Sequence, residues 1–243
     1  MENSIWGVDS VAPAHQPVGG ATGKLTFYDH LVAKGMKPDF FGRYLVAPKE
    51  QRLSKGEVRY LLDRGCRILP VFRAEIPTEN STLADGKSAA IKAITAAEAL
   101  QMPGGVFIYA DIEPDWKPSV DYLLGWCKEM MGSKYGGAGG FYCNNWSLSH
   151  FMRSYQKAFD SMAMPTKERM INLWCQHPAK TCSASAISFS PELPAFHKTG
   201  PVVWQYAINC LKFNLNGKPI GLIDMNLANQ RGFDDMWGPS PSP

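Results

Sequence analysis

The 243-residue sequence lacks any hydrophobic run that approaches the roughly 20 residues needed to cross a membrane. Its first seven residues, Met-Glu-Asn-Ser-Ile-Trp-Gly, also lack the charged, apolar and small-residue regions of a signal peptide. We therefore expect a soluble protein that is made in the cytoplasm, with no membrane span and no signal peptide.

A strong charge of one sign is also lacking. The chain has 25 lysines and arginines, 22 acidic residues and a formal net charge of +3, and its basic residues are spread along the chain. Nucleic-acid binding needs a clustered basic patch or stripe. We therefore expect no nucleic-acid partner.

The signature motifs of several enzyme classes are missing. There is no Gly-x-Ser-x-Gly elbow of a serine hydrolase. The glycine cluster at 136–140 precedes a strand rather than following one, unlike a dinucleotide-binding loop. Gly23 and Lys24 resemble the end of a phosphate-binding loop. However, Val18 stands where the first glycine of that motif belongs, and Leu25 replaces its serine or threonine. The five histidines are scattered and form no His-Glu-x-x-His. We expect neither a cofactor nor a metal ion.

The six cysteines form no Cys-x-x-Cys pair, and none has a histidine at zinc-site spacing. Cys66, Cys127 and Cys143 lie in apolar contexts that are typical of small core residues. Cys175 and Cys182 flank a short proline-containing segment, which makes them the favoured disulfide. Other pairings stay open, and so does the redox compartment.

The length and the 45% hydrophobic content suit one barrel-sized domain. Strand-like segments are expected at residues 5–10, 40–46, 67–74, 105–113, 141–144, 170–176, 202–207 and 222–226. Helices are expected at residues 26–33, 53–65, 87–102, 120–131 and 149–162. The pattern predicts an α/β fold, a single TIM-like (β/α) barrel of eight strands and about five helices over residues 1–237, with a helix-poor last third. Residues 238–243 are predicted to form a flexible tail.

The segment 105–113 starts as an apolar run and ends in Asp111 and Glu113. Side chains alternate along a strand, so both carboxylates lie on one face, roughly 6–7 Å apart along the backbone. An acidic C-terminal strand end is typical of a barrel strand that carries an active site, and two such carboxylates suit acid/base work on a glycosidic bond. The alternative is an ordinary strand end before a solvated loop, with Pro114 ending the ladder.

In such a barrel the C-terminal ends of the parallel strands converge on one mouth. Polar and aromatic residues recur at these ends: Asp9, Arg43, Arg73, Glu75, Asp111, Glu113, Tyr142, Asn144, Trp174, Gln176, Trp204, Tyr206, Asp224 and Asn226. Carboxylates ringed by aromatic planes predict a carbohydrate groove, because sugar rings stack on aromatic faces. Singly, each residue has a simpler explanation, such as Trp204 as a core residue.

Five motifs occur in the order seen in family 25 glycoside hydrolases, the Chalaropsis-type lysozymes: Gly7-Val-Asp-Ser10, Tyr109-Ala-Asp-Ile-Glu113, Gly140-Phe-Tyr142, Trp204-Gln-Tyr206 and Ile223-Asp-Met-Asn226. The chain equally resembles the glycoside-hydrolase-like domains of unknown function that share this barrel. That second resemblance adds Gly42-Arg-Tyr-Leu45, Leu69-Pro-Val-Phe72 and the helix before the acidic strand. The resemblance extends from Trp6 to about Trp237.

The resemblance implies an N-acetylmuramidase, a glycoside hydrolase that cuts the β-1,4 bond between N-acetylmuramic acid and N-acetylglucosamine in peptidoglycan. Glu113 matches the general acid, and apolar walls with a like charge at Asp111 would raise its pKa. Asp111 matches the residue that assists at the anomeric centre, as a nucleophile or by orienting the substrate's acetamido group. Asp9 and Asp224 match two further acids of the site.

The resemblance also implies that Tyr142, Trp204 and Tyr206 contact sugar rings. Strand-end placement extends the expected substrate-binding set to Arg43, Arg73, Glu75, Asn144 and Trp174. The expected partner is peptidoglycan or a related glycan.

Two alternatives are a catalytically inactive carbohydrate-binding barrel and a glycosidase acting on another polysaccharide. The four acids favour an enzyme, because a pure binder has no need of a costly acid cluster. Without a leader, the protein would reach the cell wall or periplasm after lysis or by dedicated secretion. That route suits a phage lysin or an antibacterial effector, for which an inhibitor or immunity protein is a further expected partner.

Overall fold

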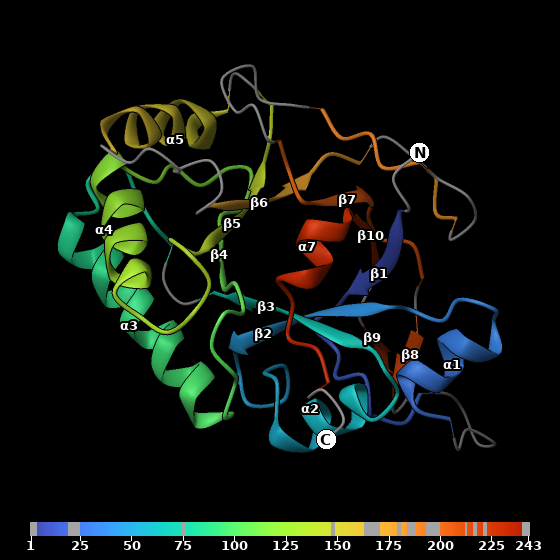
Figure 1. Ribbon diagram of the computed structural model, residues 1–243. Coiled ribbons are helices and arrows are strands. Elements are labelled where there is room, and N and C mark those ends of the chain that lie inside the picture. Colours follow the sequence, from blue (N-terminus) through green and yellow to red (C-terminus); the bar gives the residue numbers. More distant parts are fainter. Residues whose placement is uncertain are drawn as a thin grey trace.

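The computed structural model describes residues 4–18, 25–73, 76–146, 149–162, 171–178, 181–183, 188–192, 200–211, 213–215, 218–220 and 223–239. Eight strands close into a barrel in the order β1-β10-β7-β6-β5-β4-β3-β2 (Figure 1). They are β1 (Ile5–Asp9), β2 (Phe40–Val46), β3 (Arg67–Phe72), β4 (Tyr109–Asp111), β5 (Gly140–Asn144), β6 (Asn172–Gln176), β7 (Val203–Ala207) and β10 (Asp224–Ala228). The predicted α/β barrel is confirmed.

Helices surround the first half of the barrel. They are α1 (Phe27–Ala33), α2 (Lys55–Leu62), α3 (Leu83–Ala99), α4 (Val120–Met131) and α5 (His150–Ser161), each at a position where the sequence predicts one. Each begins after a serine or threonine whose hydroxyl accepts a backbone N–H of the first turn, which satisfies a donor that the helix leaves free. Among the described helices, none is long and apolar enough to span a membrane.

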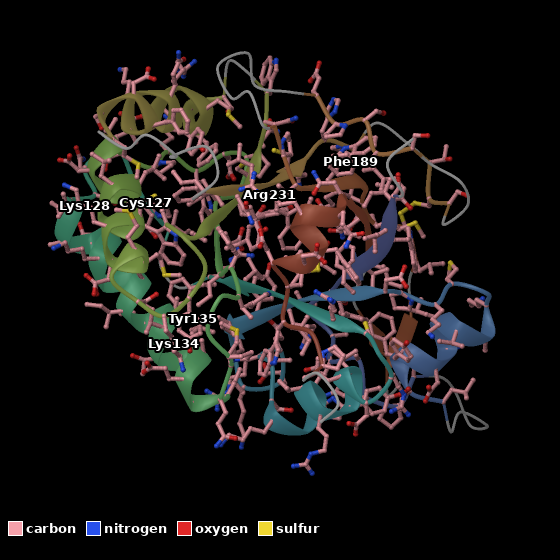
Figure 2. All side chains as sticks on the ribbon, in the orientation of Figure 1. Cys127, Lys128, Lys134, Tyr135, Phe189 and Arg231 are labelled. Atoms are coloured by element: carbon pink, nitrogen blue, oxygen red, sulfur yellow. A yellow bond between two sulfur atoms is a disulfide. The ribbon has the colours of Figure 1, made fainter. Side chains whose placement is uncertain are left out.

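The last third departs from the prediction in two places. A two-stranded hairpin, β8 (Phe213–Leu215) and β9 (Lys218–Ile220), precedes β10, and a short helix, α7 (Gln230–Asp234), follows it. The helix lies across the end of the barrel at which β6 begins (Figures 1 and 2). There Arg231 donates from Nη2 to Asn172 Oδ1 at 2.8 Å. Elements this short carry too little periodicity to be predicted. The predicted tail at 238–243 lies mostly outside the described residues and stays a prediction.

β10 runs antiparallel to both of its neighbours, whereas the other strand pairs of the barrel are parallel. The expectation of parallel strands throughout is therefore wrong for β10, which begins at Asp224 rather than ending near it. An antiparallel return needs no crossover helix, so none is required between β7 and β10. The reversed strand starts at the mouth where the others end, and Asp224 pairs directly with Asp9 of β1.

The disulfide joins Cys182 to Cys210, so the favoured pairing of Cys175 with Cys182 is wrong. Cys175 lies within β6, where its side chain is buried and free. It pairs in register with Cys143 of β5, and the two sulfur atoms are 4.0 Å apart.

Gly42 of β2 allows side chains from opposite sides of the barrel to meet. A Cβ at this position would lie 2.6 Å from Cβ of Asp9 and 2.9 Å from Cη2 of Trp174. Such distances are much shorter than a normal contact between carbon atoms, which is about 3.5–4.0 Å. The absence of a side chain at Gly42 therefore lets the ring of Trp174 extend across the barrel toward Asp9 of β1.

We expect Gly42→Ala to lower the free energy of unfolding by about 1–3 kcal/mol, because Asp9 and Trp174 must shift to admit the methyl group. The control is Gly56→Ala in α2, where the nearest atom to an added Cβ is Ser54 Oγ at 3.9 Å. That variant should be unchanged or more stable by up to about 1 kcal/mol. Urea unfolding of the three proteins is the measurement. Equal stability of Gly42→Ala and wild type would contradict the close approach.

Candidate active site

A cavity of about 130 Å³ opens at the barrel mouth. Three of the four predicted catalytic acids line it: Asp9 from β1, Glu113 just after β4, and Asp224 from β10. Asp111, the fourth, is buried beside it at the end of β4, where its Oδ2 accepts the hydroxyl of Tyr44 at 3.4 Å. The structure thus brings all four acids together.

Amide side chains hold the pair of Asp9 and Asp224. Gln205 of β7 donates from Nε2 to Oδ2 of both carboxylates, at 2.9 and 3.3 Å. Asn226 donates from Nδ2 to Oδ2 of Asp9 at 2.7 Å, and the backbone N–H of Asn209 reaches Oδ1 of Asp224 at 2.7 Å. These are neutral donors, so they orient the carboxylates without neutralising their charge.

A cation, by contrast, partners Asp111 and Glu113. Arg73, one residue beyond β3, places Nε 3.7 Å from Oδ2 of Asp111 and Nη1 3.3 Å from Oε1 of Glu113. Its guanidinium also lies over the ring of Trp116, 5.2 Å from the ring centre. The Arg73 side chain is 46% exposed, and that of Glu113 is 27% exposed, so this half of the site faces solvent.

Burial raises the pKa of every acid in the site. Asp111 has its pKa raised to about 7 by burial and then by the like charge of Glu113, against the opposing pull of Arg73. Burial raises the pKa of Glu113 too, and Arg73 lowers it in part. The pKa of Asp224 is raised by burial to about 6. Burial, followed by the charge of Asp224, raises the pKa of Asp9 well above its usual value. Such carboxyls can hold and release protons near neutral pH.

Tyr142 and Trp174, both predicted to contact substrate, form aromatic walls of the cavity; the contact itself stays a prediction. Their rings meet edge to face with centres 4.8 Å apart. Trp174 donates from Nε1 to Asn226 Oδ1 at 2.8 Å, and the hydroxyl of Tyr142 donates to Gln205 Oε1 at 3.0 Å. The aromatic walls and the amides that hold the acids therefore form one connected network.

Trp204 and Tyr206 do not reach the cavity. They flank Gln205 on β7, and since side chains alternate, the inward position of Gln205 turns both aromatics outward. Trp204 donates from Nε1 to the carbonyl of His177 at 2.9 Å and packs edge-on against Phe189, which Figure 2 labels. Tyr206 donates its hydroxyl to the carbonyl of Ser183 at 2.7 Å. These contacts hold both side chains on the outer side of β7, away from the cavity.

Arg43 also points away from the cavity, toward α2, where it is fully buried. Nε lies 2.8 Å from Oε1 of Glu57, and Nη2 donates to the carbonyl of Gln51 at 2.8 Å. Nη1 donates to the carbonyl of Ser10. Glu57 Oε1 further accepts the backbone N–H of Ala14 at 2.7 Å. Arg43, which was predicted to bind substrate, instead connects the loop after β1 to the loop after β2.

Of the two remaining predicted residues, Asn144 is not among those that line the cavity. Asn144 ends β5, and its Oδ1 accepts the backbone N–H of Trp146 at 2.8 Å, which orders the turn that follows. Glu75 lies outside the described residues.

Two residues of the site were not predicted at the mouth, Tyr44 and Gln205. Both lie inside motifs of the resemblance, and the available signal was a polar side chain at the inward position of a buried strand. The described residues contain no group of three or more histidines, cysteines or acids placed to hold a metal ion.

A family model described as "Rv2525c-like, glycoside hydrolase-like domain" matches residues 31–213. No curated protein matches the chain. An uncharacterized protein of B. stearothermophilus has a similar structure, with a TM-score of 0.76, 23% identity, and coverage of 96% of this chain and 100% of that one. The Tat-secreted protein Rv2525c of Mycobacterium tuberculosis, in complex with L-tartrate, has a TM-score of 0.60 at 15% identity, over 96% and 98% of the chains.

The spore cortex lytic enzyme SleM of Clostridium perfringens is similar as well, with a TM-score of 0.57 at 15% identity, over 96% of this chain and 69% of that one. At these identities the likenesses show the fold alone.

The raised pKa of Asp111 predicts a pH-dependent cost to stability. In the unfolded chain an aspartate ionises near pH 4, roughly, whereas the folded protein keeps this proton until about pH 7. Stability is thus lost as pH rises between these values. We expect Asp111→Asn to be near wild type at about pH 4 and more stable by on the order of 2–4 kcal/mol at about pH 8.

Urea unfolding at both pH values is the measurement, with Asp63→Asn, an exposed aspartate after α2, as the control for removing one charge. A stability gain for Asp111→Asn that is the same at both pH values would contradict the assignment.

Proposed function

The chain belongs to the family of Rv2525c-like, glycoside hydrolase-like domains, as its motifs predicted, and from this membership we propose that it hydrolyses a glycan. The substrate we propose is peptidoglycan, and the activity is that of an N-acetylmuramidase that cleaves the β-1,4 bond between N-acetylmuramic acid and N-acetylglucosamine. The observation that carries the proposal is the pair of Asp111 and Glu113 at the barrel mouth, two carboxyls with raised pKa values. The choice of polymer rests on the motifs that the sequence shares with family 25 lysozymes.

Glu113 is the proposed general acid. It lines the cavity and is partly exposed, so its carboxyl can reach a bound glycosidic oxygen, and its raised pKa favours the protonated form that such an acid needs. It gives its proton to the leaving oxygen while the bond to the anomeric carbon breaks. Asp111 assists at that carbon, as a nucleophile or by orienting the acetamido group, and water completes the hydrolysis.

Asp9 and Asp224 form the opposite wall of the cavity, where the buried amides hold them in place. In its ionised form this pair would stabilise the positive charge that develops on the sugar ring in the transition state. Tyr142 and Trp174 line the cavity that would take the ring. A glycosidase for another polysaccharide would use the same residues and differ in the surrounding contacts.

One observation favours the alternative, a barrel that binds glycans without cleaving them. Arg73 pairs with both Asp111 and Glu113, and its charge lowers the pKa of Glu113, which opposes the protonation that the proposed general acid requires. Action at the cell wall, delivery as a phage lysin or antibacterial effector, and an inhibitor or immunity partner all stay predictions.

We expect wild-type protein to release muropeptides with reducing N-acetylmuramic acid ends from purified peptidoglycan, detected by mass spectrometry. Glu113→Gln removes the proton donor and should lower the rate by about 10²-fold or more. The wild-type rate should fall as pH rises through the raised pKa of Glu113, because the acid must be protonated. Glu98→Gln, an exposed change on α3, is the matched control and should retain the wild-type rate.

If wild type and Glu113→Gln release the same fragments at the same rate, Glu113 is not the acid. Intact peptidoglycan that nevertheless retains bound wild-type protein would establish the non-catalytic alternative.

A further inference from the structure

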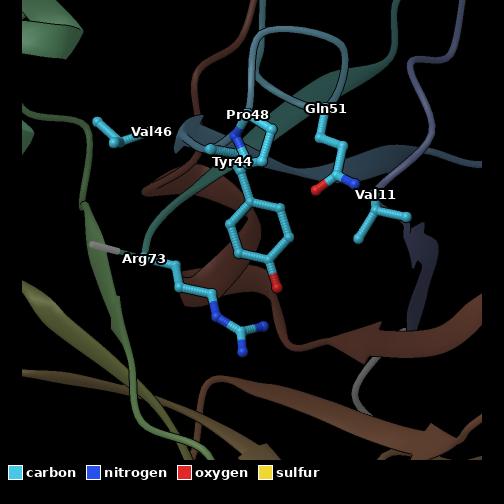
Figure 3. Close-up of a pocket in the computed structure, with 7 residues that line it drawn as sticks. Val11, Tyr44, Val46, Pro48, Gln51 and Arg73 are labelled. Atoms are coloured by element: carbon cyan, nitrogen blue, oxygen red, sulfur yellow. The ribbon is translucent and has the colours of Figure 1, made fainter. Parts of the chain in front are cut away.

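A second cavity of about 400 Å³ lies beside the carboxylate cavity (Figure 3). Its walls come from the loop after β1, from β2 and the loop that follows it, and from the end of β3. The residues that line it are Val11, Tyr44, Val46, Ala47, Pro48, Gln51 and Arg73. Nothing in the proposed function above uses this space.

The two cavities share a boundary. Tyr44 lines both of them, and its hydroxyl donates to Asp111. Arg73 lines the second cavity while it pairs with Asp111 and Glu113 of the first. Figure 3 shows the hydroxyl end of Tyr44 and the guanidinium of Arg73 next to one another. A ligand group in the second cavity would therefore lie within reach of the same cation that holds the proposed acid.

The lining is selective in its chemistry. Arg73 is the charged member, Tyr44 and Gln51 offer polar groups, and Val11, Val46 and Pro48 are apolar. A guanidinium binds a carboxylate through two parallel N–H donors, a geometry that a neutral group does not match. The cavity thus suits a carboxylate attached to a small apolar group.

The present contacts of Arg73 leave it available for such a ligand. Its distances of 3.3 Å to Glu113 and 3.7 Å to Asp111 exceed the roughly 2.7–2.9 Å of a good charge-assisted hydrogen bond. Its side chain is about half exposed, so it can move without disturbing the core.

We propose that the second cavity is a subsite for a carboxylate-bearing substituent of the glycan, and that Arg73 turns from Glu113 to this carboxylate when the substrate binds. The inference rests on the proposed function, since it names the substituent that the same site would take. An incoming carboxylate would compete with Glu113 for the guanidinium.

The consequence for Glu113 follows from electrostatics. Arg73 lowers the pKa of Glu113, so its departure would let the carboxyl hold its proton in the presence of substrate. Among the residues that the structure describes, the other titratable groups that interact with Glu113 are Tyr44, Asp111, Asp115, Tyr142 and Asp224. None of these is cationic, so Arg73 is the group among them whose movement raises the pKa. The pairing that argues against catalysis in the free protein would then be released by substrate.

The test uses small probes that contain no glycosidic bond, so wild-type protein can be measured at equilibrium. They are N-acetylmuramic acid, its methyl ester, N-acetylmuramoyl-L-alanyl-D-isoglutamine and N-acetylglucosamine. Nuclear magnetic resonance titration gives each dissociation constant. In the first probe the carboxylate belongs to the sugar, and in the third it belongs to the attached peptide.

We expect wild type to bind one of the two carboxylate probes about 10-fold or more tightly than the ester. Arg73→Gln should reduce that ratio to near one, and Arg73→Lys should keep part of it. Ala47→Trp fills the cavity while leaving Arg73 in place, and should weaken the carboxylate probe about as much. Arg64→Gln, a change on the surface near Asp29, is the control for losing one arginine and should keep the wild-type ratio.

Tighter binding of N-acetylmuramic acid would assign the carboxylate to the sugar, and tighter binding of the peptide probe would assign it to the peptide; both support the subsite. Equal binding of acid and ester, a ratio that survives Arg73→Gln, or no binding of any probe would overturn it. The peptidoglycan assay separates the two ideas. Hydrolysis of peptidoglycan without preferential binding of a carboxylate probe would contradict only the subsite. Preferential binding without hydrolysis would contradict only the proposed catalytic activity.

Discussion

The removal of four carboxylates from water at one end of the barrel is the constraint on which the rest of the site depends. Burial is the largest cause of the raised pKa of each acid. A buried charge is tolerated only with polar partners, and the structure provides two different kinds. Neutral amides from Gln205 and Asn226 hold Asp9, whereas the cation of Arg73 holds Asp111 and Glu113. The first side is buried and fixed, while the second is partly exposed and adjustable.

Most of the barrel could be predicted from the sequence because its signals are local. Apolar runs mark the strands, and a serine or threonine precedes each of the five main helices. The direction of β10 could not be predicted, since the alternation of side chains is the same whichever way a strand runs. Asp224 was expected at the mouth as the end of a parallel strand, and it lies there as the start of an antiparallel one. Its position was right and the reason was wrong.

The face of the strand on which a side chain lies was the second feature that the sequence did not predict. All five residues of β7 are buried, so apolar side chains pack on both faces of the strand and an aromatic residue does not mark the inner face. The aromatic residues Trp204 and Tyr206 were therefore placed inward, although Gln205 takes that position and joins the acids. Arg43 was misplaced because its partner Glu57 comes from a helix, a pairing that strand pattern alone does not contain.

Arg43 lies outside the carboxylate cavity but still affects the shape of the site. Arg43 donates to the carbonyl of Ser10, which precedes Val11, and to the carbonyl of Gln51. Val11 and Gln51 are walls of the second cavity, so the buried pair of Arg43 and Glu57 sets the distance between two loops that it helps to hold. Removing one partner of such a pair leaves an unpaired buried charge, which costs far more than the pair itself contributes. The adjustable Arg73 therefore works between fixed walls, and a substituent that enters the cavity can displace the arginine more readily than it can widen the opening.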